Sequence, residues 1–186
     1  MDRSYKKLLN LNRQQPNLSI IGSSTVCLLA FDHETGLLET ANLGDSGFLL
    51  VRNGRIITRS QKQTHNFNTP KVWHRLKFTK NRIINLKQLA YAPPTIKCVA
   101  DHPRDASQLS IACRPGDLII TATDGLFDNI NDDMILAELA ALPEDPDEIV
   151  RTVLESVASS LATLARRKAI DKSFLSVSFI YIILLK

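Results

Sequence analysis

The stretch that decides the fold runs from residue 24 to residue 59 and reads STVCLLAFDHETGLLETANLGDSGFLLVRNGRIITR. Short runs of apolar and β-branched residues alternate in it with turn sequences such as Gly44-Asp45-Ser46-Gly47 and Asn53-Gly54, a pattern typical of consecutive strands. The pattern predicts strands over 24–32, 37–43, 48–52 and 55–59. Because such short turns join antiparallel neighbours, we expect these strands to form an antiparallel meander.

Further along the chain, strands are followed by helices. Residues 107–114 and 117–123 are expected to form a second antiparallel pair around Pro115-Gly116. Residues 131–142, with Asn131 as the N-cap, and residues 147–168, with acids in the first turn and cations in the last, are expected to be helices. This order predicts an α+β fold with helices packed on an antiparallel sheet or on two stacked sheets.

The two ends of the chain are less regular. Residues 4–11 have apolar spacing that is compatible with a helix, and the N-terminus has neither the apolar core of a secretory signal nor the composition of a transit peptide. Residues 174–185 are mostly apolar but fall short of the roughly 17–25 residues that a membrane-spanning helix needs. We therefore expect a buried or edge strand there and no membrane span.

The composition fits one soluble domain, since 44% of the 186 residues are hydrophobic and 23% are charged. The formal charge of +4 comes from residues 71–87, which hold six cations and no acid. Without those six, 17 basic residues stand against 19 acidic ones, so the excess is local and no nucleic-acid partner is expected. The three cysteines form no Cys-x-x-Cys pair, which favours buried thiols in a reducing, intracellular compartment over a zinc site or disulfides.

The chemistry is concentrated in residues 121–129, TATDGLFDN. An apolar strand delivers Asp124 to its carboxyl end, and Gly125 permits a sharp turn and close backbone approach there. A carboxylate on a rigid strand end is well placed to bind a hard divalent cation such as Mg²⁺ or Mn²⁺. Taken alone, an Asp-Gly after a strand is weak evidence for a metal site and is better explained as a turn former or a helix cap. In the Gly44–Gly47 turn, Asp45 is expected to hold its own turn through side-chain-to-backbone hydrogen bonds.

Several of these stretches resemble one protein family in order and spacing. TATDGLFDN is similar to the metal-binding motif of the type 2C class of metal-dependent serine/threonine protein phosphatases. GSSTVCLLAFD (22–32) and TANLGDSGFLLVRNGRI (40–56) are similar to the central strands of the same family. NFNTP (66–70) and AYAPP (90–94) resemble its mitochondrial branch. The resemblance covers residues 22–70 and 88–176 and marks the chain as a relative of this class.

The resemblance implies a β-sandwich flanked by helices, with two Mg²⁺ or Mn²⁺ ions at one end. It implies that a metal-bound water hydrolyses phosphoserine and phosphothreonine in a phosphoprotein substrate. By this comparison Asp124 is a metal ligand, Gly125 forms the turn behind it, and Asp128 braces that turn. The branch resemblance implies a mitochondrial location. We expect a monomer.

Parts of the family pattern are absent from the sequence. The family has an Asp-Gly-x-Gly-Gly motif near its N-terminus, and this chain has no adjacent glycine pair. The family also has a C-terminal Asp-Asp before a strand, whereas Asp132-Asp133 lies at an expected helix start. We expect one partial phosphatase domain over residues 1–186, truncated at both ends, with a basic insertion at 71–87 and a divergent apolar tail at 177–186.

Three functions remain open on the sequence alone. The first is an active metal-dependent protein serine/threonine phosphatase. The second is a catalytically dead pseudophosphatase or phosphoprotein-binding fragment that keeps only part of the ligand set. The third is a fragment without function, whose exposed sheet edges and apolar surface favour aggregation.

Overall fold

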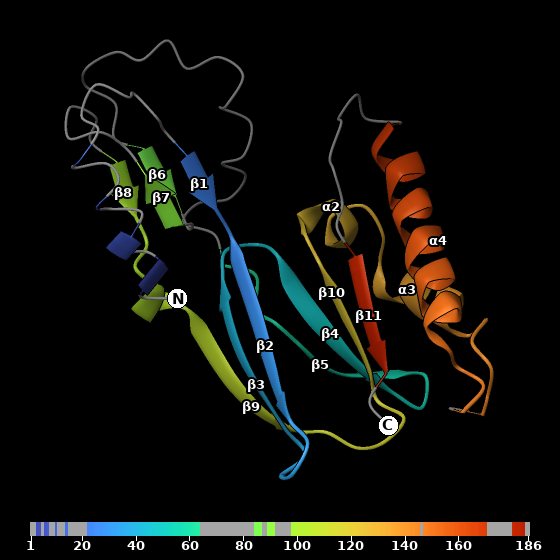
Figure 1. Cartoon of the computed structure of the whole chain (residues 1–186). Helices are drawn as coiled ribbons and strands as arrows, with labels where there is room; N and C mark the ends of the chain where they lie inside the picture. The colour runs from blue at the N-terminus through green and yellow to red at the C-terminus, as the bar shows by residue number, and fades with distance from the viewer. Residues whose placement is uncertain are drawn as a thin grey trace.

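Two stacked antiparallel sheets and a layer of helices make up the main body of the protein (Figure 1). The structure, a computed structural model, describes residues 3–4, 6–7, 10, 14, 22–63, 84–86, 89–91, 98–145, 147–170 and 180–184. The larger sheet has the strand order β11-β10-β4-β5, and the second sheet has the order β2-β3-β9. Two small sheets pair β1 with β7 antiparallel and β6 with β8 in parallel. The expected α+β class is confirmed.

The strands are β1 (Gly22–Ser24), β2 (Val26–Asp32), β3 (Leu37–Leu43), β4 (Gly47–Arg52), β5 (Arg55–Arg59), β6 (Ile84–Leu86), β7 (Leu89–Tyr91), β8 (Cys98–Ala100), β9 (Ser107–Ala112), β10 (Leu118–Ala122) and β11 (Ile180–Leu184). The helices are a short 3-10 turn (Pro103–Asp105), α2 (Asp124–Phe127), α3 (Asp132–Leu139) and α4 (Arg151–Ile170). None of the helices that the structure describes is both long enough and apolar enough to cross a bilayer.

The interior between the two large sheets is apolar. Leu38 of β3 packs there against Leu50 of β4 and Ile119 of β10, and all three are at most 2% exposed. Partly buried side chains from β2, β9 and the segment after β9 complete this layer: Leu29, Phe31, Ile111 and Cys113. The alternation of burial along β3 follows from its position, because one of its faces meets the other sheet and the opposite face does not.

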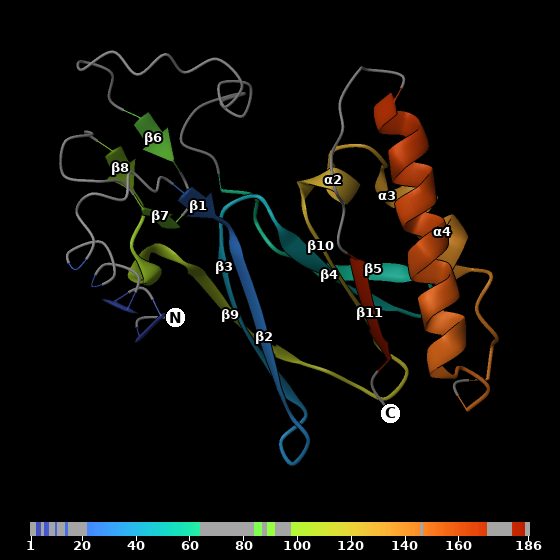
Figure 2. The same cartoon turned by 45° about the horizontal axis from the view of Figure 1, so that its top comes forward.

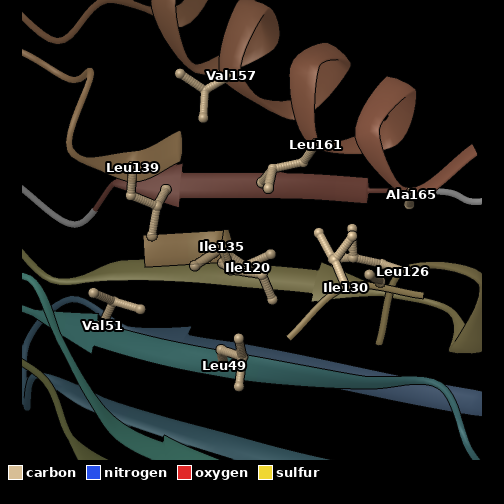
Figure 3. Packing of buried hydrophobic residues seen from close by; sticks show 11 residues of the cluster. Leu49, Val51, Ile120, Leu126, Ile130, Ile135, Leu139, Val157, Leu161 and Ala165 are labelled. Carbon is tan, nitrogen blue, oxygen red and sulfur yellow. The ribbon is translucent and has the colours of Figure 1, made fainter. Parts of the chain in front are cut away.

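A second and larger core lies on the opposite face of the β10–β4 sheet, under the helices. Figure 3 shows Leu161 of α4 pointing toward the sheet, above Ile120 of β10 and Leu49 of β4. These three side chains are fully buried. Both views of the fold place α4 alongside β11 (Figure 1, Figure 2). β4 is therefore covered on both faces, which explains why it is a continuous apolar run without alternation.

The expected strands all form, but two expected pairings are wrong. The four strands of residues 24–59 do not make one meander, because β2 and β3 pair in one sheet and β4 and β5 pair in the other. β9 and β10 do not pair with each other either, since β9 pairs with β3 and β10 pairs with β4. A short turn can carry the chain between stacked sheets as well as between neighbours, and Gly116, at φ 87°, lies in such a crossing.

The helices largely follow the sequence pattern. Asn131 caps α3 as expected, since its side chain accepts a hydrogen bond from the Met134 N–H at 3.0 Å. α4 begins at Arg151, later than predicted, so the acids at 147 and 148 lie outside it and its first turn has none. Asp145 explains the delay, because its side chain accepts the Asp147 N–H and its carbonyl accepts the Glu148 N–H.

The tail forms the edge strand that was expected there. β11 pairs with β10 along five residue pairs, from Leu118↔Leu184 to Ala122↔Ile180. Ile182 packs into the core beneath the helices, and Ile183 is 47% exposed. The described residues of the predicted helix over 4–11, which are 4, 6, 7 and 10, are helical. Of the basic segment 71–87, the structure describes residues 84–86, which form β6. The boundaries predicted for a partial domain remain a prediction.

Candidate functional site

The structure places Asp124 directly beyond the end of β10, as the first residue of α2. Thr123, in extended conformation, follows the last strand residue and is the N-cap of α2, so the expected turn is a single helical turn. Asp128 N–H donates to the Asp124 carbonyl at 2.8 Å, and the Asn129 amide donates to the Gly125 carbonyl at 2.8 Å. Gly125 and Leu126 are buried. Asp124 is therefore held at a fixed position while its side chain stays half-buried at the rim.

Strand pairing brings a second carboxylate to the same place. Ala122, the last residue of β10, is paired with Gly47, the first residue of β4. The turn before β4, which carries Asp45, therefore lies beside the turn after β10, which carries Asp124. Burial, and then the negative charges of Asp45 and Asp128, raise the pKa of Asp124 above its ordinary value. The Gly125 N–H and the charge of Lys62 act in the opposite direction.

The Asp45 turn is held by its neighbours. Gly44 takes φ 103°, a conformation that favours glycine, and its N–H donates to the Gln63 side chain at 3.3 Å. The Gln63 N–H donates back to the Gly44 carbonyl at 3.0 Å, and Ser46 and Thr25 share a hydroxyl hydrogen bond of 2.6 Å. Within the described residues, the Asp45 carboxylate makes none of the hydrogen bonds expected for a role in bracing the turn. Sequence reasoning missed its proximity to Asp124.

Asp128 is the exposed C-cap residue of α2 and forms an ion pair. The Lys62 ammonium donates to its two carboxylate oxygens at 2.7 and 2.9 Å. Its backbone N–H, and not its side chain, closes the turn on Asp124. The role predicted for the Asp128 side chain, as a brace for the metal-binding turn, therefore remains a prediction.

An open groove of about 670 Å³ borders this region, between the α2–α3 connection, β5 and the end of α4. The Arg59 guanidinium lies 5.5 Å from the centre of the Phe127 ring and forms an ion pair with Asp132. This cation–π contact and ion pair tie β5 to α2 and α3, because both partners of Arg59 belong to the helical side. Asp128 lines this groove and also lies close to Asp124.

Gly47 links the fold to the site through a very close contact. A Cβ built on Gly47 would lie 2.0 Å from the Ser60 Oγ and 3.9 Å from the Phe127 ring. Ser60 cannot easily move away, since its Oγ accepts the Phe48 N–H at 2.9 Å and is buried. The absence of a side chain at Gly47 thus allows β5 and α2 to approach the start of β4.

Replacing Gly47 by alanine is expected to lower the free energy of unfolding by about 1–3 kcal/mol, because the new methyl group overpacks the contact with Ser60. Urea denaturation of G47A, S60A and the double variant measures it. Removing the Ser60 Oγ relieves the clash, so the double variant should lose less than the sum of the two single changes. Additive losses would show that the contact with Ser60 is not the cause.

The described carboxylates fit a divalent cation only in part. Asp124 and Asp45 are two oxygen donors of the hard type that Mg²⁺ and Mn²⁺ prefer, and the negative charge around Asp124 would be relieved by a cation. No group of three or more His, Cys, Asp or Glu side chains in the described part of the chain is arranged to hold a metal ion. These residues therefore do not amount to a two-ion site.

Comparison with known proteins connects this geometry to one family. The family model described as Protein phosphatase 2C matches residues 2–88. The human protein phosphatase PTC7 homolog is 40% identical over 175 residues, which cover 93% of this chain and 49% of that protein. The chain thus spans about half the length of the curated relatives that it matches.

Solved structures agree on the fold. The photosystem II phosphatase PBCP aligns with a TM-score of 0.57 at 24% identity, covering 91% of this chain and 58% of that one. The catalytic domain of the serine/threonine phosphatase PstP, solved with two manganese ions, aligns with a TM-score of 0.60 at 20% identity, covering 98% and 67%. These likenesses concern the fold. The sequence matches to the family model and to the PTC7 homologs lead to one assignment: the chain belongs to the protein phosphatase 2C family.

Proposed function

We propose that this chain is part of a protein phosphatase that hydrolyses phosphoserine and phosphothreonine in phosphoproteins with the help of divalent cations. The observation that carries the proposal is the position of Asp124. It is fixed at the end of β10, half-buried, and surrounded by negative charge from Asp45 and Asp128. A carboxylate in such surroundings is best balanced by a cation, which is the chemistry that this family uses.

Mg²⁺ or Mn²⁺ is the cofactor proposed, with Asp124 as a ligand and Asp45 as a second candidate ligand. When bound, such ions would activate water and neutralise phosphate charge. The chain's own contribution is to hold the first ligand rigidly. β10 and the buried Leu126 fix the backbone of Asp124, and the Gly44–Gln63 hydrogen bonds fix the turn of Asp45. The structure solved with two manganese ions supports the choice of metal through shared fold only.

A second candidate function is phosphoprotein binding without turnover. It is favoured by the ion pair between Lys62 and Asp128, which already neutralises one carboxylate near Asp124. It is also favoured by the incomplete ligand set in the described residues. In that case the chain would bind a phosphoprotein and leave it phosphorylated.

Purified protein mixed with a phosphothreonine peptide and Mn²⁺ is expected to release inorganic phosphate, and chelation of the metal is expected to stop the release. The matched control is the same peptide with phosphotyrosine in place of phosphothreonine, which should not be hydrolysed. Selective retention of the phosphothreonine peptide over its unphosphorylated form, without turnover, would favour the binding function. If the chain shows no turnover and no selective binding, both proposals are contradicted.

An intracellular and mitochondrial location is also proposed. Its support is the resemblance of residues 66–70 and 90–94 to the mitochondrial branch of the family. Cell fractionation of the tagged protein would test it, and recovery outside mitochondria would contradict it.

A further inference from the structure

Lys62 lies on a segment that is fixed to the Asp45 turn from both sides. On one side, the Ser60 N–H donates to the Phe48 carbonyl at 3.0 Å. On the other side, the Gln63 N–H donates to the Gly44 carbonyl at the same distance. Lys62 therefore extends from a backbone that is tied to β4 and to the turn of Asp45, and it bonds across to α2.

The ammonium of Lys62 is a tethered cation at the edge of the Asp124 region. It binds both oxygens of Asp128, and its charge also acts on Asp124 against the effects of Asp45 and Asp128. Arg59, a second cation close to Asp128 in the groove, is engaged by Asp132 and Phe127. The carboxylates of Asp45, Asp124 and Asp128 thus lie near the single ammonium group of Lys62. Its positive charge offsets only part of their negative charge.

A divalent cation at these carboxylates would be repelled by the ammonium. Either the ammonium would move away from Asp128, or the divalent cation would bind close to the positive charge of Lys62. A unit charge and a divalent cation a few ångström apart repel, even in water, by enough to change an affinity roughly tenfold. The exposure of Lys62 and Asp128, 47% and 51%, means that the ammonium can move aside into solvent.

We propose that Lys62 is a built-in competitor of the divalent cation, which weakens metal binding at Asp124 and Asp45 by holding Asp128 as its partner. This inference rests on the proposed function, because it concerns the regulation of the same site. The concentration of metal that the chain needs would then depend on one lysine, in the segment after β5. The geometry described here is the state in which the lysine is engaged with Asp128.

Mn²⁺ binding to the purified full chain tests this by isothermal titration calorimetry and by the electron paramagnetic resonance signal of free Mn²⁺. Lys62→Met is expected to bind Mn²⁺ roughly tenfold more tightly than the unaltered chain. Lys62→Arg, which keeps the charge, should bind like the unaltered chain. Arg55→Met removes an exposed cation at the other end of β5, where it is paired with Arg52, and should leave the affinity unchanged.

The variant Asp124→Asn separates the two levels of the proposal. If it abolishes Mn²⁺ binding while Lys62→Met binds no more tightly than the unaltered chain, Lys62 is not a competitor and the metal role of Asp124 stands. If no variant shows binding that depends on Asp124, both the inference and the proposed metal site are wrong. Circular dichroism of each variant confirms that the fold is kept.

Discussion

Replacing Asp124 by asparagine is expected to lower Mn²⁺-dependent phosphate release from a phosphothreonine peptide by at least about 100-fold. The side chain keeps its shape but loses the charge that would bind the cation, and loss of a direct ligand should exceed the roughly 10–100-fold effect of supporting groups. The measurement is the initial rate over a series of Mn²⁺ concentrations. Asp133→Asn, an exposed change in the first turn of α3, is the matched control and should stay within about twofold of the unaltered rate, since exposed changes of this kind have small effects.

The same substitution should not weaken the metal-free fold. Because burial and like charges raise the pKa of Asp124, its ionised form is disfavoured in the folded state. A carboxyl whose pKa is raised by folding contributes its whole stabilisation at pH values below its pKa in the unfolded chain. That stabilisation is lost as the pH rises through its pKa in the folded protein. At neutral pH the charge therefore costs stability, and asparagine should give an equal or slightly higher melting temperature in a chelator. Unchanged activity in Asp124→Asn would remove Asp124 from the mechanism.

The local elements could be predicted from the sequence, because each depends on neighbouring residues. The strand ends, the Asn131 cap and the position of Asp124 after β10 follow from periodicity and turn chemistry. The delayed start of α4 was the local failure, since the Asp145 turn competes with the first helical turn.

The pairing of strands could not be predicted, and the proximity of Asp45 to Asp124 was missed for the same reason. Its proximity to Asp124 depends on β4 pairing with β10 so that Gly47 meets Ala122. Short apolar strands can pair with many partners, and only the assembled sandwich selects one. The sequence around a turn residue such as Asp45 therefore does not indicate which other turn will lie beside it in the folded protein. The ion pair of Lys62 with Asp128 was missed in the same way.

Asp117 is expected to be the most important charged residue for stability. It is fully buried at the start of β10, and Arg52 donates to both its carboxylate oxygens at 2.7 Å. The Arg114 N–H donates to it at 2.8 Å, and Arg52 also donates to the Ala112 carbonyl at 3.3 Å. This cluster joins the end of β4 to the crossing between β9 and β10, where the chain passes from one sheet to the other.

Replacing Asp117 by alanine should lower the free energy of unfolding by about 3 kcal/mol at pH 7, because it leaves the Arg52 charge and a backbone donor without their partner. Urea denaturation measures the loss. The exposed pair of Arg151 with Glu155 is the control, and Glu155→Gln should cost less than about 0.5 kcal/mol. A loss as small as that in the Asp117 variant would mean that the buried cluster does not stabilise the crossing.

The pH dependence of this difference identifies its origin. Burial alone would raise the pKa of Asp117, but the hydrogen bonds from Arg52 and the Arg114 N–H outweigh it and hold the pKa below its ordinary value. A lowered pKa contributes stability that is full above the unfolded pKa of about 3.9 and is lost as pH falls through the folded pKa. The gap between the unaltered chain and Asp117→Ala should therefore be constant from pH 7 to about pH 5 and shrink below about pH 4. A gap that stays constant down to pH 2 would attribute the loss to packing and not to the ion pair.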